Sequence, residues 1–134
     1  MELDGMFKAM EISASGLQAE WMRTQVIANN IANAETTQTP EGGPYRRREI
    51  VFSTVLDQLN GVQVKGVVSS TAPPRKVYDP GHPDADSEGF VSMPDIKLPL
   101  EMVDMLAASR AYQANLAMIR NFKSVAEETI KLLR

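Results

Sequence analysis

The stretch that decides the fold is residues 99–134, PLEMVDMLAASRAYQANLAMIRNFKSVAEETIKLLR. Its apolar and aromatic side chains recur at alternating intervals of three and four, which is typical of a helix that buries one stripe. Pro99 suits the start of such a helix, and Lys131 and Arg134 suit its negative C-terminal end. The apolar members of the stripe are Met102, Met105, Tyr112, Leu116, Ile119, Ala126, Ile130 and Leu133.

A second apolar stripe lies about 100° round the same predicted helix. A single partner helix cannot cover both stripes, so the second one needs another partner. This stripe consists of Val103, Ala107, Ala111, Ala114, Met118, Phe122, Val125 and Leu132.

The N-terminal zone repeats the helical pattern. Gly16 inside it costs roughly 0.5–1 kcal/mol relative to alanine, which indicates a close approach by a neighbouring helix. The Asn-rich segment 28–34 contains poor helix formers, so we expect the helix to fray or end there. The stripe, in which Thr24 alone is polar, is Phe7, Met10, Ala14, Leu17, Trp21, Thr24, Ala28 and Ile31.

The zone between the helices holds seven of the eight prolines. Residues 49–52 and 61–68 are predicted to be short strands, and residues 71–94 an extended, turn-rich excursion. We therefore expect residues 1–35 to form an N-terminal helix, 36–98 an insert and 99–134 a C-terminal helix. The fold class is mainly α: an elongated antiparallel hairpin of two long helices with a small, irregular β-containing insert.

The length of the predicted helices argues for assembly. A helix of about 34 residues is roughly 50 Å long, whereas a compact globule of this size is about 36 Å across. The excess apolar stripe is therefore expected to be buried against other chains. Trp21 and Tyr112, each within a stripe, are most simply core residues.

Composition excludes several classes of protein. The chain has no cysteine and a single histidine, His82, which leaves little room for a catalytic triad or a metal centre. A net charge of −3 offers no broad attraction for nucleic acid. No apolar run is long enough to insert into a membrane, and the acidic N-terminus is unlike a cleaved secretion signal. We expect no catalytic residue, cofactor or metal.

Two acidic clusters have features of metal sites. Residues 84–89 with Asp95 imitate a calcium loop, but Pro80 and Pro83 forbid the entering helix, so a solvated turn is favoured. Asp79, His82 and Asp84 are likewise expected to be turn residues. A calcium- or metal-binding module stays an alternative.

Polar side chains elsewhere suggest packing roles. Residues 46–48, three arginines, are expected at a strand edge or subunit contact, and residues 42–44 form a turn. Arg110 near Glu101 offers only surface ion pairing. Asn29 and Asn33 share a helix face; they either bridge to a neighbouring backbone or cap the helix end.

Particular motifs resemble those of a known family. Residues 13–17 (SASGL) and 26–34 (VIANNIANA) resemble the N-terminal signature of the bacterial flagellar rod and hook proteins. Residues 101–105 (EMVDM) and 109–115 (SRAYQAN) resemble the C-terminal signature of that family. Within it, the two segments similar to proximal rod members are 42–47 (GGPYRR) and 77–86 (VYDPGHPDAD).

The resemblance implies a structural subunit that stacks helically into a drive shaft, which crosses the periplasm and transmits torque for motility. The implied partners are copies of itself, proximal and distal rod proteins, the adaptor at the membrane ring, and the type III export apparatus, which would export it without signal cleavage. A soluble coiled-coil adaptor or export chaperone is a further alternative. The residues expected to pack between subunits are Leu17, Trp21, Ile27, Asn29, Asn30, Ile31, Asn33, Met102, Met105, Arg110, Tyr112, Asn115, Leu116 and Ile119.

Overall fold

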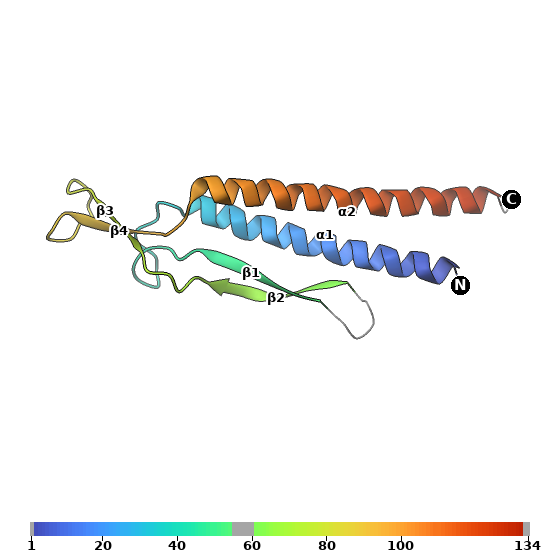
Figure 1. The fold of residues 1–134 in the computed structure, drawn as a ribbon, viewed down its shortest axis with the longest axis horizontal. Helices are drawn as coiled ribbons and strands as arrows, with labels where there is room; N and C mark the ends of the chain where they lie inside the picture. Colours follow the sequence, from blue (N-terminus) through green and yellow to red (C-terminus); the bar gives the residue numbers. More distant parts are fainter. Residues whose placement is uncertain (1, 55–60, 133–134) are drawn as a thin grey trace.

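The computed structural model describes residues 2–54 and 61–132 and contains two long helices and two short β-hairpins (Figure 1). Helices α1 and α2 run antiparallel and bring both ends of the chain to one end of an elongated molecule, as the sequence predicted. Neither described helix combines the length and apolar content needed to cross a membrane. In chain order the elements are α1 (Glu2–Ala32), β1 (Arg48–Thr54), β2 (Val62–Ser69), β3 (Arg75–Tyr78), β4 (Phe90–Met93) and α2 (Leu98–Leu132).

The contact between α1 and α2 is lined by small and polar side chains. Gly16 faces Asn115: a Cβ atom at Gly16 would lie 3.0 Å from Asn115 Nδ2. The expected close approach of a second helix at Gly16 is thus confirmed, and what fills the space is an amide side chain. Ala108 on α2 is fully buried and Ala19 on α1 nearly so.

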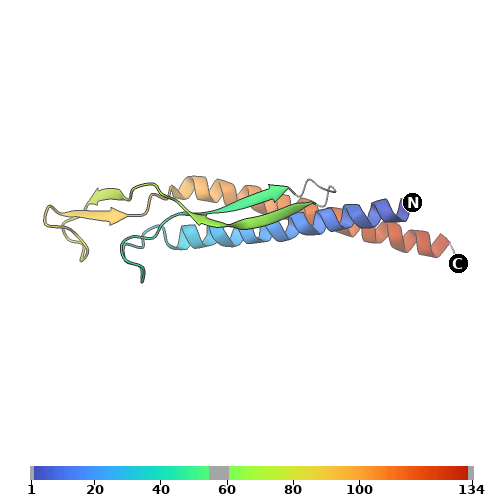
Figure 2. The same cartoon turned by 90° about the horizontal axis from the view of Figure 1, so that it is seen from below.

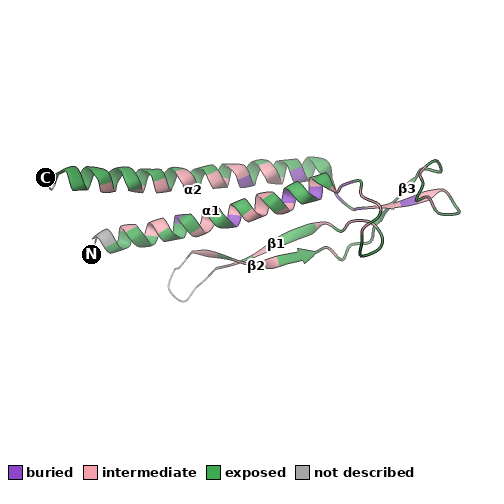
Figure 3. Cartoon of the chain, turned by 180° about the vertical axis from the view of Figure 1, so that it is seen from behind, coloured by how far each residue is buried: buried purple, intermediate pink, exposed green. Residues whose placement is uncertain are grey.

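Much of the apolar surface on the helices stays exposed in the single chain (Figure 3). On α2, 63% of Val103 and 51% of Val125 are accessible, as expected for a stripe without a partner in the same chain. Trp21 is 54% exposed, so its placement in the core of the chain was wrong; Tyr112 is half-buried. Helix α1 turns a different face inward, one marked by small and polar residues.

The β1–β2 hairpin lies along α1 (Figure 2). Its strands pair antiparallel, with Glu49 opposite Val68 and a bulge after Val51. The Ser15 hydroxyl accepts a hydrogen bond of 3.1 Å from the Val62 N–H and so attaches the start of β2 to α1. Both strands were predicted.

Gly61 is the tightest point of that attachment. Its φ is +90°, and a Cβ atom there would overlap Ser15 Oγ. We expect Gly61→Ala to lower the free energy of unfolding by about 2 kcal/mol, because backbone strain adds to the clash. Gly42→Ala is the matched control, since Gly42 has φ +91° and open space around it. Urea unfolding of both variants measures the difference; equal losses would show that the contact with Ser15 is unimportant.

Residues 71–94, expected as an extended, turn-rich excursion, contain two paired strands that the sequence analysis did not identify, β3 and β4. Val77 pairs with Val91, which is completely buried, and the rings of Tyr78 and Phe90 meet edge to face at 5.3 Å. The prolines misled the prediction because they flank the strands: two precede β3, two lie in its connection to β4, and Pro94 follows β4. Each strand itself is free of proline and keeps its hydrogen-bond donors.

Candidate functional site

The most enclosed polar residues of the described chain lie where α1, β1 and α2 meet. Asn30 comes from the last turns of α1 and Glu101 from the first turn of α2, and each is 1% exposed. Tyr45, Arg47 and Arg48 approach them from the segment that enters β1. We call these five residues the polar clasp.

Asn30 is the centre of the polar clasp. Its Nδ2 donates to the Arg48 carbonyl at 2.8 Å and to Glu101 Oε2 at 3.1 Å. Its Oδ1 accepts from the Arg48 N–H at 2.9 Å and from the Tyr45 hydroxyl at 3.1 Å. A primary amide has two donor hydrogens and two acceptor lone pairs, so its hydrogen-bonding capacity is filled. Burial of this polar side chain is therefore compensated.

The charge of Glu101 is balanced by Arg47. The Arg47 Nε donates to Glu101 Oε1, and the same guanidinium pairs with Glu49 and lies 3.9 Å from Asp104. Partial burial pulls the pKa of Arg47 down, but the hydrogen bond and charge of Glu101, together with Glu49, raise it overall. Arg47 therefore stays cationic.

Tyr45 stays a neutral donor in this setting. Burial raises the pKa of its hydroxyl, and the carboxylate of Glu101 adds to the increase against the opposing charge of Arg48. A protonated hydroxyl is what the acceptor Oδ1 of Asn30 requires. The polar clasp thus joins two helices and a strand through buried polar groups that have hydrogen-bond partners, which suits a structural junction.

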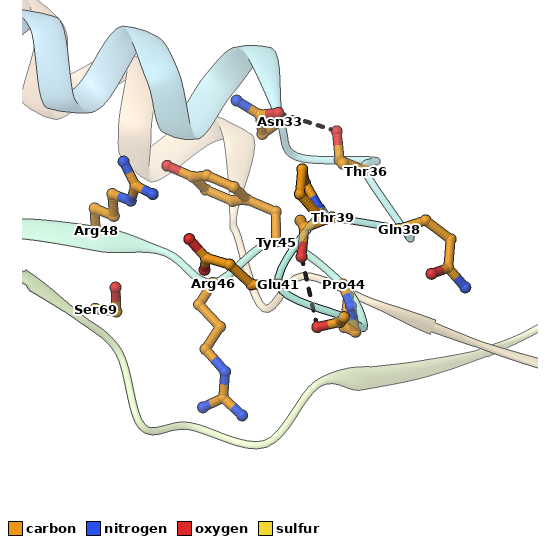
Figure 4. Close-up of a pocket in the computed structure, with 12 residues that line it drawn as sticks. Asn33, Thr36, Gln38, Thr39, Glu41, Pro44, Tyr45, Arg46, Arg48 and Ser69 are labelled. Atoms are coloured by element: carbon orange, nitrogen blue, oxygen red, sulfur yellow. Dashed lines mark hydrogen bonds between the residues drawn. The ribbon is translucent and has the colours of Figure 1, made fainter.

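An open hollow of about 460 Å³ lies beside the polar clasp (Figure 4). It is bounded by Asn33, Tyr45, Arg46 and Ser69 and by the turn of residues 39–44. The predicted turn is present: the N–H of Gly42 donates to the Thr39 carbonyl at 2.9 Å.

The asparagines of residues 28–34 serve both of the roles considered for them: one ends the helix and another bridges to a neighbouring backbone. Asn33 Nδ2 donates to the Asn29 carbonyl at 2.9 Å and Asn33 Oδ1 accepts from Thr36 Oγ1 at 3.2 Å, so Asn33 finishes the helix locally. Asn29 is exposed. The capping alternative therefore holds for Asn33, whereas the residue that bridges to a neighbouring backbone is Asn30.

The structure gives the arginines of residues 46–48 and Arg110 different surroundings from those expected. Arg47 turns inward to Glu101, whereas Arg46 is exposed and donates to the Ser70 carbonyl at 3.4 Å. Arg110 is exposed, and the partner of Glu101 is Arg47 rather than Arg110. Sequence reasoning missed Arg47 and Glu101 as a pair because 54 positions separate them.

The two acidic clusters are organised as turns. Asp84 Oδ2 accepts from Thr37 Oγ1 at 2.7 Å, which ties the β3–β4 connection to the segment after α1. Asp86 Oδ1 accepts from the N–H groups of Glu88 and Phe90, both at 2.9 Å. Across residues 2–54 and 61–132, no three acidic or histidine side chains converge as metal ligands.

The Asp86 turn predicts a pH response. The hydrogen bond from Phe90 lowers the pKa of Asp86, helped by Glu88, Gly89 and the charge of Lys76. The stability that this carboxylate adds is present above its unfolded pKa of about 3.9 and is lost as pH falls through the lower folded pKa.

We expect the amide shifts of Glu88 and Phe90 in NMR spectra to titrate with a midpoint below about 3.9. In Asp86→Asn, which keeps the acceptor oxygen, this titration should vanish. A midpoint above that value would contradict the assignment.

Comparison with known proteins identifies similar sequences along nearly the whole chain. The flagella basal body rod protein family model matches residues 10–38, and the flagellar basal body rod FlgEFG protein C-terminal model matches residues 87–132. The flagellar basal-body rod protein FlgC of Borreliella burgdorferi is 38% identical over 97% of this chain and 99% of its own length. That of Salmonella typhimurium is 38% identical over 95% and 97%, and that of Agrobacterium fabrum 39% identical over 98% of each.

Proposed function

The chain belongs to the FlgC family of flagellar basal-body rod proteins, and from this premise we propose that it builds the proximal part of the rod and transmits torque across the periplasm. It is a structural subunit of the flagellar basal body, not an enzyme, and it assembles with other rod components.

The observation that carries the proposal is the pair of long helices with exposed apolar stripes. Val103, Met118 and Val125 on α2 and Phe7 and Trp21 on α1 are all at least 48% exposed. Monomeric proteins seldom leave so much apolar surface uncovered, and burial between chains would remove it from water. Of the site residues expected from the sequence, Ile27 and Asn30 are buried within the chain. The others are proposed to pack between subunits, and Trp21 and Met102 are the most exposed of the large apolar ones.

The individual partners of the subunit are proposed on the same premise. We propose that the helices contact proximal and distal rod proteins, further copies of this chain and the adaptor at the base of the rod. Export through the flagellar type III apparatus without signal cleavage belongs to the proposal as well. The outer β3–β4 hairpin would then give this subunit its own surface.

Complementation combined with cross-linking tests this function. In cells that lack their own copy of the gene, the full chain should restore swimming and complete basal bodies in electron micrographs. The chain has no cysteine, so single cysteines at Trp21 and Val125 give unambiguous thiol cross-links. Cross-links to rod subunits are expected. A chain that restores swimming but cross-links only to soluble export factors would overturn the packing proposal.

A further inference from the structure

We infer that the polar clasp sets the register in which α1 and α2 pair, a positioning role separate from the contacts between subunits. Outside the polar clasp, the contact of Gly16 with Asn115 also depends on how the helices are aligned. Apart from Ile27 and the polar clasp itself, the nearly buried side chains on the described parts of both helices are small: Ser13, Ala19 and Ala108. Small side chains make shallow knobs, so a shift of one helical repeat costs little packing.

The connection between the helices does not impose a register either. They are joined through the whole insert, residues 33–97, rather than through a tight turn. A long connection tolerates displacement of its ends at small entropic cost. The alignment of the two helices therefore has to come from specific contacts.

The polar clasp supplies a buried polar contact between the helices, and the separate contact of Gly16 with Asn115 agrees with the same alignment. Asn30 meets Glu101, and Gly16 meets Asn115. The steps from 16 to 30 on α1 and from 101 to 115 on α2 are both fourteen residues, or two heptads, so both pairs obey one antiparallel register.

A shift of one heptad in either direction separates Glu101 from Asn30. In one direction Asn30 would face Ala108, and in the other Glu101 would face Arg23, while the bonds of Glu101 to Asn30 and Arg47 are lost in both. In the first shift the buried carboxylate of Glu101 is left unpaired, and in the second Arg23 could replace Arg47 but Asn30 loses its bond to Glu101. These losses penalise both shifts, as a single buried asparagine does in coiled coils. The register in turn decides how the apolar stripes of the two helices line up for neighbouring subunits.

Disulfide reporters in the cysteine-free chain test the inference. Cysteines at positions 16 and 115 report the observed register, and cysteines at 16 and 108 or at 16 and 122 report a shift of one heptad either way. Asn115 is shortened to alanine in the two shifted reporters, so that a side chain at position 16 has room. Purified full-length chain is oxidised and the closed fraction measured on gels, so the readout needs no rod assembly.

With the polar clasp intact, we expect only the 16–115 pair to close. In the variant Asn30→Leu, Arg47→Met, Glu101→Leu, apolar side chains replace the polar ones without leaving a buried charge, so the helices should still pair. The shifted pairs should then close several-fold more than in the parent chain. The matched control Asn29→Leu alters an exposed asparagine one position away. In this control, as in the parent chain, the 16–115 pair should close and the shifted pairs should not.

Three results would overturn the inference. The apolar variant could close only the 16–115 pair, which would mean that other contacts set the register. It could lose every cross-link together with its helical circular dichroism, which would assign the polar clasp to stability alone. The parent chain could fail to close the 16–115 pair, and the register would then not be a property of the chain.

Discussion

Replacing Asn30 by alanine is expected to lower the free energy of unfolding of the full chain by about 3 kcal/mol. The substitution removes four hydrogen bonds and leaves Glu101 Oε2 and the Arg48 backbone groups without the amide. Each buried polar group left without a partner costs about 1–3 kcal/mol, but water can reach the half-exposed Tyr45 and Arg48, which limits the total. Urea unfolding followed by circular dichroism measures the loss.

Asn29→Ala is the control for that measurement. Asn29 is the same residue type in the same helical turn, but its side chain is exposed. Its replacement should change the free energy of unfolding by less than about 0.5 kcal/mol. Equal losses at Asn29 and Asn30 would mean that the hydrogen bonds of the polar clasp do not cause the loss, since alanine has the higher helix propensity and should not itself destabilise α1.

The sequence was sufficient for the two helices because their pattern is local. Intervals of three and four residues over about 25 positions or more identify a helix whatever surrounds it, and α1 and α2 are 31 and 35 residues long. The pattern did not show which face turns toward the partner helix. Trp21 lies in the apolar stripe of α1 yet is exposed, because the buried side chains of α1 are those of Ser13, Ala19, Ile27 and Asn30.

The polar clasp was beyond reach of sequence reasoning for a different reason. Asn30 and Glu101 are 71 positions apart, and nothing in the spacing of either residue indicates the other. A carboxylate in the first turn of a helix is ordinarily explained by the helix dipole, and the sequence offered Glu101 only a surface ion pair with Arg110. Burial of such a group depends on the tertiary fold, which places Arg47 at the entry to β1 and Asn30 on α1 against the carboxylate.

Aspartate at Leu116, Met118 or Ile119 is expected to abolish swimming by blocking rod assembly. Leu116 and Ile119 are half-buried and belong to the first stripe of α2, whereas Met118 belongs to the second stripe and is 48% exposed. A charge that must be buried between subunits without a partner costs several kcal/mol at each of the many repeated contacts in a rod. Motility in soft agar and electron microscopy of basal bodies measure the effect.

The Met118 variant separates assembly from folding. Because Met118 is largely exposed in the single chain, Met118→Asp should leave the urea midpoint of the full chain nearly unchanged while swimming is lost. Leu116→Asp and Ile119→Asp should lower that midpoint as well, since both side chains are half-buried within the chain. Met118→Leu preserves apolar character and volume at the same position and should swim normally. Normal swimming of Met118→Asp, with complete basal bodies, would show that the second stripe of α2 faces solvent in the rod and that the apolar excess is covered elsewhere.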